Sequence, residues 1–260
     1  MRRYTRFAVY WAPPAGSALA QEGAAWLGWD AATGQKPALD PARQSARQSP
    51  RQSARQSAQR PALPDPAGLD LAALTERPRR YGFHATLKAP FRLAEDSDAE
   101  ALETAFEQQA AAMAPFEMPA LTARWLGPFL ALVPARDAPA LSGFAGRWVE
   151  ALEAHRAPLS PAEMARRRAA GLSARQDGYL QRWGYPYVFD EFRFHLTLTG
   201  PVADDTGPPS VKDAIMGEAR ARFGPLMGRP VQVTEVCLFA QTEAGYFVVL
   251  SRAPLGGAKI

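Results

Sequence analysis

Two histidines stand in nearly identical stretches of the sequence, FHATLKAP and FHLTLTGP. His84 and His195 are each followed, two residues later, by a threonine. The pKa of an imidazole lies near neutrality, so a pair of imidazoles suits acid–base chemistry in which one accepts a proton and the other donates one. Threonine hydroxyls can donate hydrogen bonds to phosphoryl oxygens as charge grows in the transition state. We therefore predict a phosphoryl-transfer site with four catalytic residues: His84, Thr86, His195 and Thr197.

Both motifs have the alternating pattern of a β-strand, in which residues two apart share a face. The predicted polar faces carry Gly82, His84, Thr86 and Lys88 in the first strand, and Arg193, His195, Thr197 and Thr199 in the second. The predicted substrate-binding residues are Lys88, Arg193, Tyr81 and Tyr10. Neither face has a carboxylate, and the two cations could neutralise an anionic phosphorus substrate as a metal does elsewhere. We expect neither a metal nor a cofactor.

The two motifs belong to a longer internal repeat. From each histidine, a helix is predicted about 13 or 14 residues later, and a pair of strands about 35 to 50 residues later. The chain thus resembles two copies of one unit, which would face each other across a groove. We expect one bilobal domain over 1–260, with lobe one over about 13–134 and lobe two over about 185–252 plus a strand at 5–12. A basic helical connector is predicted over about 138–184.

Composition is that of an ordinary soluble domain, with 47% hydrophobic and 22% charged residues among 260. The single cysteine, Cys237, permits no internal disulfide and fits a reducing compartment. No apolar run is long enough to span a membrane. The apolar stretch that follows the N-terminal arginines is too short for a signal peptide, and we interpret it as the first strand. We expect a cytoplasmic protein without a membrane partner.

Residues 41–60 repeat an ARQS-like unit that has no large apolar side chain. Such a segment cannot bury enough surface to offset the entropy of ordering, so we predict a disordered insertion. Its five arginines raise the net charge to +4, and the rest of the chain carries −1. Nucleic acid is therefore not the expected partner, although an arginine-rich arm here is the alternative.

Other chemistries find little support in the sequence. Zinc could in principle be bound by His84, His155, His195 and Cys237, but no close ligand spacing such as CxxC, HxH or HExxH occurs. The sequence has no GxxxxGK[ST], GxGxxG or GxSxG motif, so Walker-type, dinucleotide and serine-hydrolase chemistry are not predicted. We interpret His155 as a surface residue and Cys237 as a core residue.

The paired motifs HATL (84–87) and HLTL (195–198) resemble those of the two-histidine (2H) phosphoesterase superfamily. The strings RRYGFHATLKAPF (79–91), RWGYPYVFDEFRFHLTLTGP (182–201), WLGWDAATG and GPFLALVP are similar to one bacterial branch, which is associated with phosphonate-utilisation genes. The resemblance covers nearly the whole chain except 41–60. It implies an α+β fold of two pseudo-symmetric lobes, each a mainly antiparallel sheet with helices outside, around a central groove.

The resemblance also implies activity on cyclic phosphodiesters and assigns His84, Thr86, His195 and Thr197 to the site. The predicted function is a metal-independent hydrolase of a small ribose-based cyclic phosphate linked to phosphonate catabolism, such as 5-phosphoribosyl 1,2-cyclic phosphate. Two alternatives stay open. One is an RNA-end phosphodiesterase or ligase that uses the arginine-rich region 166–182. The other is a module that binds a phosphorylated ligand without turnover.

Overall fold

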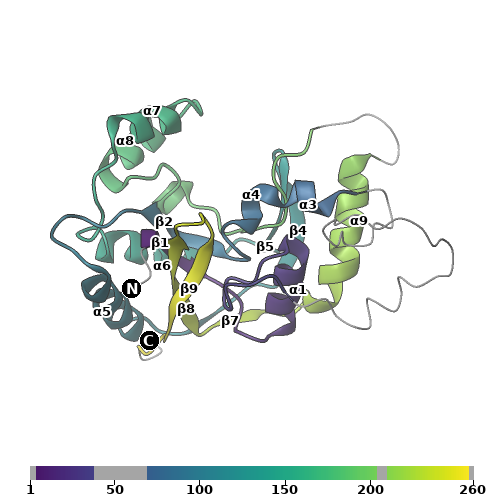
Figure 1. The fold of residues 1–260 in the computed structure, drawn as a ribbon. Coiled ribbons are helices and arrows are strands. Elements are labelled where there is room, and N and C mark those ends of the chain that lie inside the picture. The colour runs from purple at the N-terminus through teal and green to yellow at the C-terminus, as the bar shows by residue number, and fades with distance from the viewer. Residues whose placement is uncertain (1–3, 38–68, 204–209, 258–260) are drawn as a thin grey trace, which may run out of the picture.

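Antiparallel β-structure forms the centre of the protein in the computed structural model, which describes residues 4–37, 69–203 and 210–257 (Figure 1). In chain order, the strands of the described residues are β1 (Tyr4–Trp11), β2 (Ala85–Phe91), β3 (Phe116–Met118), β4 (Leu121–Leu126), β5 (Phe129–Pro134), β6 (Leu196–Thr197), β7 (Val231–Val233), β8 (Glu235–Thr242) and β9 (Phe247–Pro254). One sheet has seven strands in the order β4-β5-β6-β2-β1-β8-β9, and β3 pairs with β7 in a second. All observed pairings are antiparallel. The α+β class with an antiparallel sheet is confirmed.

The internal repeat is visible in the order of the elements. After the first motif strand come a helix, the short strand β3 and the hairpin β4–β5; after the second come a helix, β7 and the hairpin β8–β9. Equivalent strands meet across the repeat, because β2 pairs with β6 and β3 pairs with β7. The motif strands and the short strands of the two copies thus lie next to their counterparts.

The pairing of the hairpins differs from the grouping of strands that we expected. The predicted lobes placed each motif strand with the strand pair that follows it in sequence. In the structure β6 instead pairs with β5, whereas β2 pairs with β1, which in turn joins β8 and β9. Figure 1 shows the strands β1, β2, β8 and β9 beside α5 and α6, and the hairpin β4–β5 beside α1 and α9. Each motif strand thus lies in the part of the sheet that contains the hairpin of the other copy, and β1 lies between β2 and β8.

Helices cover the outside of the sheet, where α5 packs on β8 and β9, α6 on β2 and α9 on β4. The α-helices are α1 (Ala18–Leu27), α3 (Leu71–Leu74), α4 (Glu76–Arg79), α5 (Ala99–Ala111), α6 (Pro139–Ala151), α7 (Pro161–Arg168), α8 (Ala174–Trp183) and α9 (Val211–Phe223). Two short 3₁₀ helices are η1 (Phe189–Glu191) and η2 (Gly224–Leu226). The predicted helical connector consists of α6, α7 and α8. Capping boxes at Ser160 and Ser173 begin α7 and α8.

Alternation along β1 divides the apolar side chains between the two faces of the sheet. Val9 and Trp11 join the main hydrophobic core, together with Ala85 and Leu196 of the motif strands. Tyr10 joins a smaller cluster on the other face, which also contains Phe239 and Phe247. The predicted alternation is thus present around Ala85 and Leu196, which are both directed into the main core.

Two further predictions concern residues 41–60 and membrane-spanning segments. The predicted insertion over 41–60 lies outside the described residues. In the described part of the chain, no helix is long and apolar enough to cross a membrane.

Gly23 in α1 lies against the ring of Phe83, the residue just before the first motif histidine. A Cβ atom at this position would lie 2.0 Å from Cδ1 of Phe83. We predict that Gly23→Ala lowers the free energy of unfolding by about 1–3 kcal/mol through overpacking, as measured by urea denaturation. Gly143→Ala in α6 is the matched control, because a Cβ there meets nothing within 4 Å and should stabilise the helix. Equal effects of the two substitutions would contradict this packing argument.

Candidate functional site

The two motif histidines come together because their strands are neighbours at the centre of the sheet. Ala85 pairs with Leu196 in the antiparallel register of β2 and β6. That register places His84 opposite Thr197, and it places the residues two positions away diagonally across the strands. Directly opposite Cβ atoms lie about 4.5–5.5 Å apart and diagonal neighbours about 7–8 Å apart. The two imidazoles are such a diagonal pair on one face.

His84 is held by contacts on both ring nitrogens. Nδ1 lies 2.9 Å from the carbonyl oxygen of Gly82, and Nε2 lies 3.2 Å from the hydroxyl of Thr86. The ring stacks on Tyr10 with a centroid separation of 3.7 Å. A carbonyl can only accept, so Nδ1 carries a hydrogen and Nε2 of the neutral ring is left as the acceptor. The first motif histidine is therefore oriented as a base.

His195 repeats the first half of this arrangement. Its Nδ1 lies 2.7 Å from the carbonyl oxygen of Arg193, two residues before it, just as Nδ1 of His84 meets Gly82. The ring packs against Phe129 at 5.7 Å between centroids. Both histidines are half-buried, and both use Nδ1 to fix the ring. Proton exchange is thereby left to Nε2, which in His84 contacts the hydroxyl of Thr86.

Burial lowers the pKa of both imidazoles. For His84 the pKa falls to about 4, mainly because burial disfavours the charged ring, with a further lowering from His195 and an opposing effect of the hydrogen bond to Gly82. The pKa of His195 is also lowered by burial, against the hydrogen bond to Arg193. Because a charge on His195 lowers the pKa of His84, the two rings lie close enough to interact electrostatically. In the absence of an anion, His84 is neutral at pH 7.

A pocket of about 240 Å³ opens beside this face of the sheet. Its lining includes His84 and Thr197 from the two motifs, Tyr81, Phe129 and Arg77. Arg77 lies in α4 and is exposed, so it brings a positive charge to the pocket. Arg77 and Phe129 were not among the predicted site residues, because Arg77 lies outside the quoted strings and Phe129 lies in GPFLALVP, away from both histidine motifs. Their only signal was position, since Arg77 comes shortly before one motif and Phe129 begins a strand that pairs with the other.

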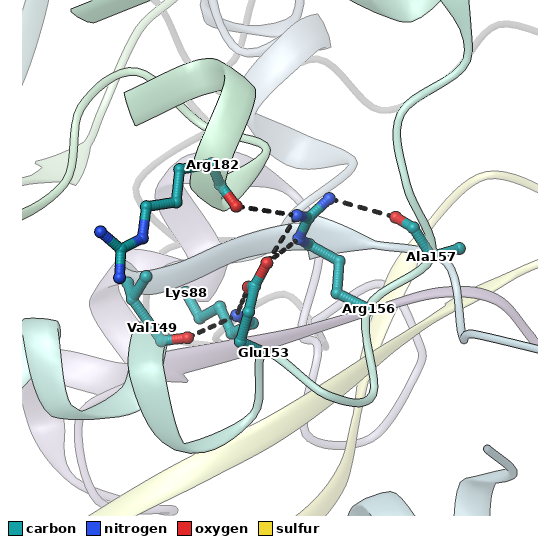
Figure 2. A network of polar contacts seen from close by, with 6 residues as sticks. All are labelled: Lys88, Val149, Glu153, Arg156, Ala157 and Arg182. Atoms are coloured by element: carbon teal, nitrogen blue, oxygen red, sulfur yellow. Dashed lines mark hydrogen bonds and ion pairs between the residues drawn. The ribbon is translucent and has the colours of Figure 1, made fainter. Parts of the chain in front are cut away.

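Lys88 does not face the site, which corrects its prediction as a substrate-binding residue in this groove. Tyr10 pairs with Thr86, but Val9 pairs with Lys88, so β2 has one extra residue at this point. This β-bulge turns the side chain of Lys88 to the face opposite Thr86. There Lys88 is buried, and Nζ donates to the carbonyl oxygen of Val149 at 2.8 Å and to Glu153 at 3.0 Å (Figure 2).

The other predicted substrate-binding residues have different environments. Arg193 is exposed, and its carbonyl oxygen orients His195. Tyr81 lines the pocket, with its ring 6.3 Å from the ring of His84. Tyr10 is buried beneath His84 as a stacking partner, and burial raises the pKa of its phenol. Tyr81 is thus positioned to contact a ligand directly, and Tyr10 positions the imidazole.

Within the described residues, no three His, Cys, Asp or Glu side chains are grouped so that they could hold a metal ion. His155 is half-buried rather than on the surface, with Nδ1 2.7 Å from the hydroxyl of Ser97. Cys237 is buried in the smaller cluster, as predicted. In the arginine-rich region, Arg168 forms an ion pair with Asp177 at 2.6 Å.

The chain is similar to one described protein family and to two curated proteins. The sequence profile of a family described as "Protein of unknown function (DUF1045)" matches residues 86–248. Two curated relatives are named ribose 1,5-bisphosphate phosphokinase PhnN. The protein from Janthinobacterium sp. (strain Marseille) is 40% identical over 75% of this chain and 38% of its own length, and that from Laribacter hongkongensis (strain HLHK9) is 35% identical over 92% and 49%. The chain therefore spans less than half the length of these relatives.

Two solved structures are also similar to the chain. A structure titled as that of a phosphoesterase has a TM-score of 0.41 and 17% identity, over 96% of this chain and 98% of its own. Escherichia coli LigT in complex with 3'-AMP has a TM-score of 0.41 and 16% identity, over 97% and 99%. At this identity no residue role or ligand carries over to this chain.

The lowered pKa of His84 predicts how stability depends on pH. The unfolded chain, with a pKa of 6.5, binds the proton before the folded one does, so the free energy of unfolding should decrease as pH falls from 6.5 toward 4. Denaturation at a series of pH values should show a shallower decrease for His84→Gln than for the wild type. In an NMR titration, a wild-type His84 that titrates near 6.5 would contradict the prediction.

Proposed function

Since the chain belongs to the DUF1045 family, whose description assigns no activity, we propose its function from the site: a phosphoesterase that hydrolyses a small cyclic phosphodiester without a metal. The observation that carries this proposal is the pairing of Ala85 with Leu196, which brings together the two imidazoles that directly precede β2 and β6. Each ring is fixed through Nδ1 by the carbonyl oxygen two residues before it. Nε2 of His195, and Nε2 of His84 once the hydroxyl of Thr86 moves away from it, can then exchange protons with a group bound between the strands.

The reaction needs one neutral and one protonated imidazole. The neutral ring removes a proton from water as the water oxygen forms a new bond to phosphorus. The ester P–O bond breaks, and the imidazolium donates its proton to the leaving oxygen, which opens the cyclic diester to a monoester. The lowered pKa values supply the neutral base. An anionic phosphodiester next to the rings favours protonation of the second imidazole, because an opposite charge stabilises the charged form. Either ring can take either role in this scheme.

Hydroxyl and cationic groups around the pocket complete the proposed site. Thr197 lines the pocket with His84, where its hydroxyl can donate to a phosphoryl oxygen. Thr86 is engaged with Nε2 of His84 and can reorient toward substrate when that ring takes up a proton. Arg77 replaces Lys88 as the cation at the groove, and it can neutralise a phosphodiester from the rim of the pocket.

The names of the curated relatives support a phosphorylated ribose as the substrate class. The 260 residues contain no GxxxxGK[ST] motif, so we assign the phosphokinase activity in those names to the part of the relatives that this chain does not cover. Fusion of the two parts in one chain suggests consecutive reactions on related compounds. We therefore propose that the substrate is a ribose-based cyclic phosphate, which is consistent with a role in phosphonate breakdown.

Replacing either histidine tests the mechanism. We predict that His84→Ala and His195→Ala each lower kcat on a ribose cyclic phosphate by roughly 10²–10⁴-fold, the usual contribution of a positioned acid or base. Phosphorus NMR in the presence of a chelator should follow conversion of the cyclic diester to a monoester. The wild-type kcat/KM should have a bell-shaped pH profile, with one limb lost in each variant. Hydrolysis that survives both substitutions, or tight binding without turnover by the wild type, would refute the proposal.

Arg77 tests the assignment of the cation. We predict that Arg77→Gln raises KM for the same cyclic phosphate by about 10-fold or more, as expected for loss of a charge-assisted contact. Thermal stability should change little, because this side chain is exposed. Arg80→Gln is the matched control, since Arg80 is also exposed but does not line the pocket. Equal KM values for the two variants would exclude Arg77 from substrate binding.

A further inference from the structure

The pocket beside the histidines has two walls, which come from distant parts of the sequence. All its lining residues except Phe129 belong to two segments, 77–84 and 197–201. The first segment includes the end of α4 and the first motif histidine, and the second includes the threonine of the other motif. The shape of the pocket therefore depends on what holds α4 in place.

The helices before the first motif are too short to be stable by themselves. α3 and α4 have four residues each, and a helix of one turn needs tertiary contacts to persist. Both short helices lie beside α1 (Figure 1). Arg77 is exposed, so its place at the pocket follows from the position of α4.

Arg79, the last residue of α4, ties this segment to α1. Its Nε donates to the carbonyl oxygen of Leu27 at 2.6 Å, and its Nη2 donates to the carbonyl oxygen of Ala72 at 3.1 Å and to the hydroxyl of Thr75 at 2.8 Å. Leu27 ends α1, where the carbonyl groups lack partners within the helix and a cation is favoured. One side chain therefore joins α1, α3 and α4.

The directions of these hydrogen bonds require an arginine at this position. Gly28 ends α1 in the left-handed conformation with φ 73°, and a Cβ there would lie 3.4 Å from Nε of Arg79. The planar guanidinium thus fits closely against the end of α1 and donates to two helices from two different nitrogens. A lysine ammonium is a single point charge and cannot reproduce this fork. All three acceptors are uncharged, so the contact depends on direction more than on charge.

The second wall of the pocket is attached to the same elements. The amide of Gly200 donates to the carbonyl oxygen of Leu74, the last residue of α3, at 2.7 Å. Trp26 of α1 donates from its indole to the carbonyl oxygen of Leu198 at 2.8 Å. Since α1 holds the first wall through Arg79 and the second through Trp26, its C-terminal end sets the spacing between the two.

The first motif histidine is held independently of the Arg79 side chain. The amide of Phe247 in β9 donates to the carbonyl oxygen of Arg80 at 2.7 Å, which fixes the chain directly after α4. β2, which follows His84, pairs with both β1 and β6. Loss of the Arg79 side chain should therefore displace α4 and leave the imidazole in place.

We propose that Arg79 is a positioning residue that holds α4 against α1, and thereby places Arg77 at the pocket and sets the affinity for substrate. Arg79 does not itself line the pocket, so it acts through α4 and not by contact with the substrate. The inference rests on the proposed function, because the substrate is the cyclic phosphodiester of that reaction. It assigns to Arg79 an effect on KM that is larger than its effect on kcat.

A double-mutant cycle tests whether Arg79 acts through Arg77. With ribose 1,2-cyclic phosphate, Arg79→Gln should raise KM by about 10-fold at nearly constant kcat, as expected for Arg77→Gln. In the double variant, KM should stay within about twofold of its value in Arg77→Gln, because the side chain that Arg79 positions is already absent. Independent contributions would multiply to about 100-fold and would overturn the inference. A wild-type KM in Arg79→Gln would overturn it as well.

Two further variants separate position from charge and from stability. Arg79→Lys keeps the charge but loses the fork, so KM should rise as in Arg79→Gln, whereas a wild-type KM would show that only the charge matters. Arg156→Gln is the matched control, because Arg156 also donates to a carbonyl oxygen near the end of a helix, that of Arg182 in α8, but does not line the histidine pocket. It should lower Tm without a change in KM. An equal rise of KM in Arg156→Gln would assign the effect to general destabilisation and refute the positioning role.

Amide hydrogen exchange measured by NMR tests the wall without catalysis. In Arg79→Gln, the amide of Gly200, which is bonded to Leu74, should exchange about 10-fold faster than in the wild type. The amide of Phe247, which is bonded to Arg80, should exchange at the wild-type rate. Faster exchange at both amides, or at neither, would contradict a specific displacement of α3 and α4.

Two results distinguish this inference from the proposed function. If the wild type hydrolyses the cyclic phosphate and the Arg79 variants have the wild-type KM, the positioning role is wrong and the phosphoesterase stands. If the wild type does not hydrolyse it but exchange of the Gly200 amide depends on Arg79, the phosphoesterase is wrong and Arg79 still positions the wall of the pocket.

Discussion

A single backbone pairing, Ala85 with Leu196, is the constraint on which the site depends. The strand β6 is only two residues long, so its position must be fixed from outside. Trp26 of α1 donates from its indole to the carbonyl oxygen of Leu198 at 2.8 Å, and the hydroxyl of Thr199 accepts from the backbone of Leu130 at 3.0 Å. These contacts hold the second motif against α1 and β5.

The same alternation that builds the core exposes the chemistry. In each motif the phenylalanine before the histidine is buried, with 7% of Phe83 and 6% of Phe194 exposed, and the alanine or leucine after it is wholly buried. Because those apolar side chains are buried on one face of the sheet, the histidine and the threonine must lie on the other face. Hydrophobic burial therefore sets the direction of the rings, and the carbonyl oxygens of Gly82 and Arg193 then fix their rotation. In each motif, the residues that pack into the core therefore alternate with the residues of the proposed site.

The sequence predicts this arrangement to the extent that it is periodic and repeated. The faces of His84 and His195 follow from alternation, and the repeat explains why the two strands meet. Periodicity fails at Lys88, because a β-bulge adds a residue in β2 and no local signal marks it. Arg77 was missed because only the tertiary packing of α4 brings it to the pocket. The grouping of each motif strand with the hairpin of the other copy likewise depends on long-range packing, which the repeat alone does not specify.

Desolvation sets the protonation state of the histidine pair. Burial lowers the pKa of both His84 and His195, so each charged imidazolium is less favourable in the protein than in water. A nearby anion offsets this cost, because an opposite charge stabilises the charged form of an imidazole. In the proposed reaction, an anionic phosphodiester would therefore favour protonation of one histidine and leave the other neutral, which is the pair of states that hydrolysis requires. The burial that lowers both pKa values would thus couple the protonation of the pair to the binding of the substrate.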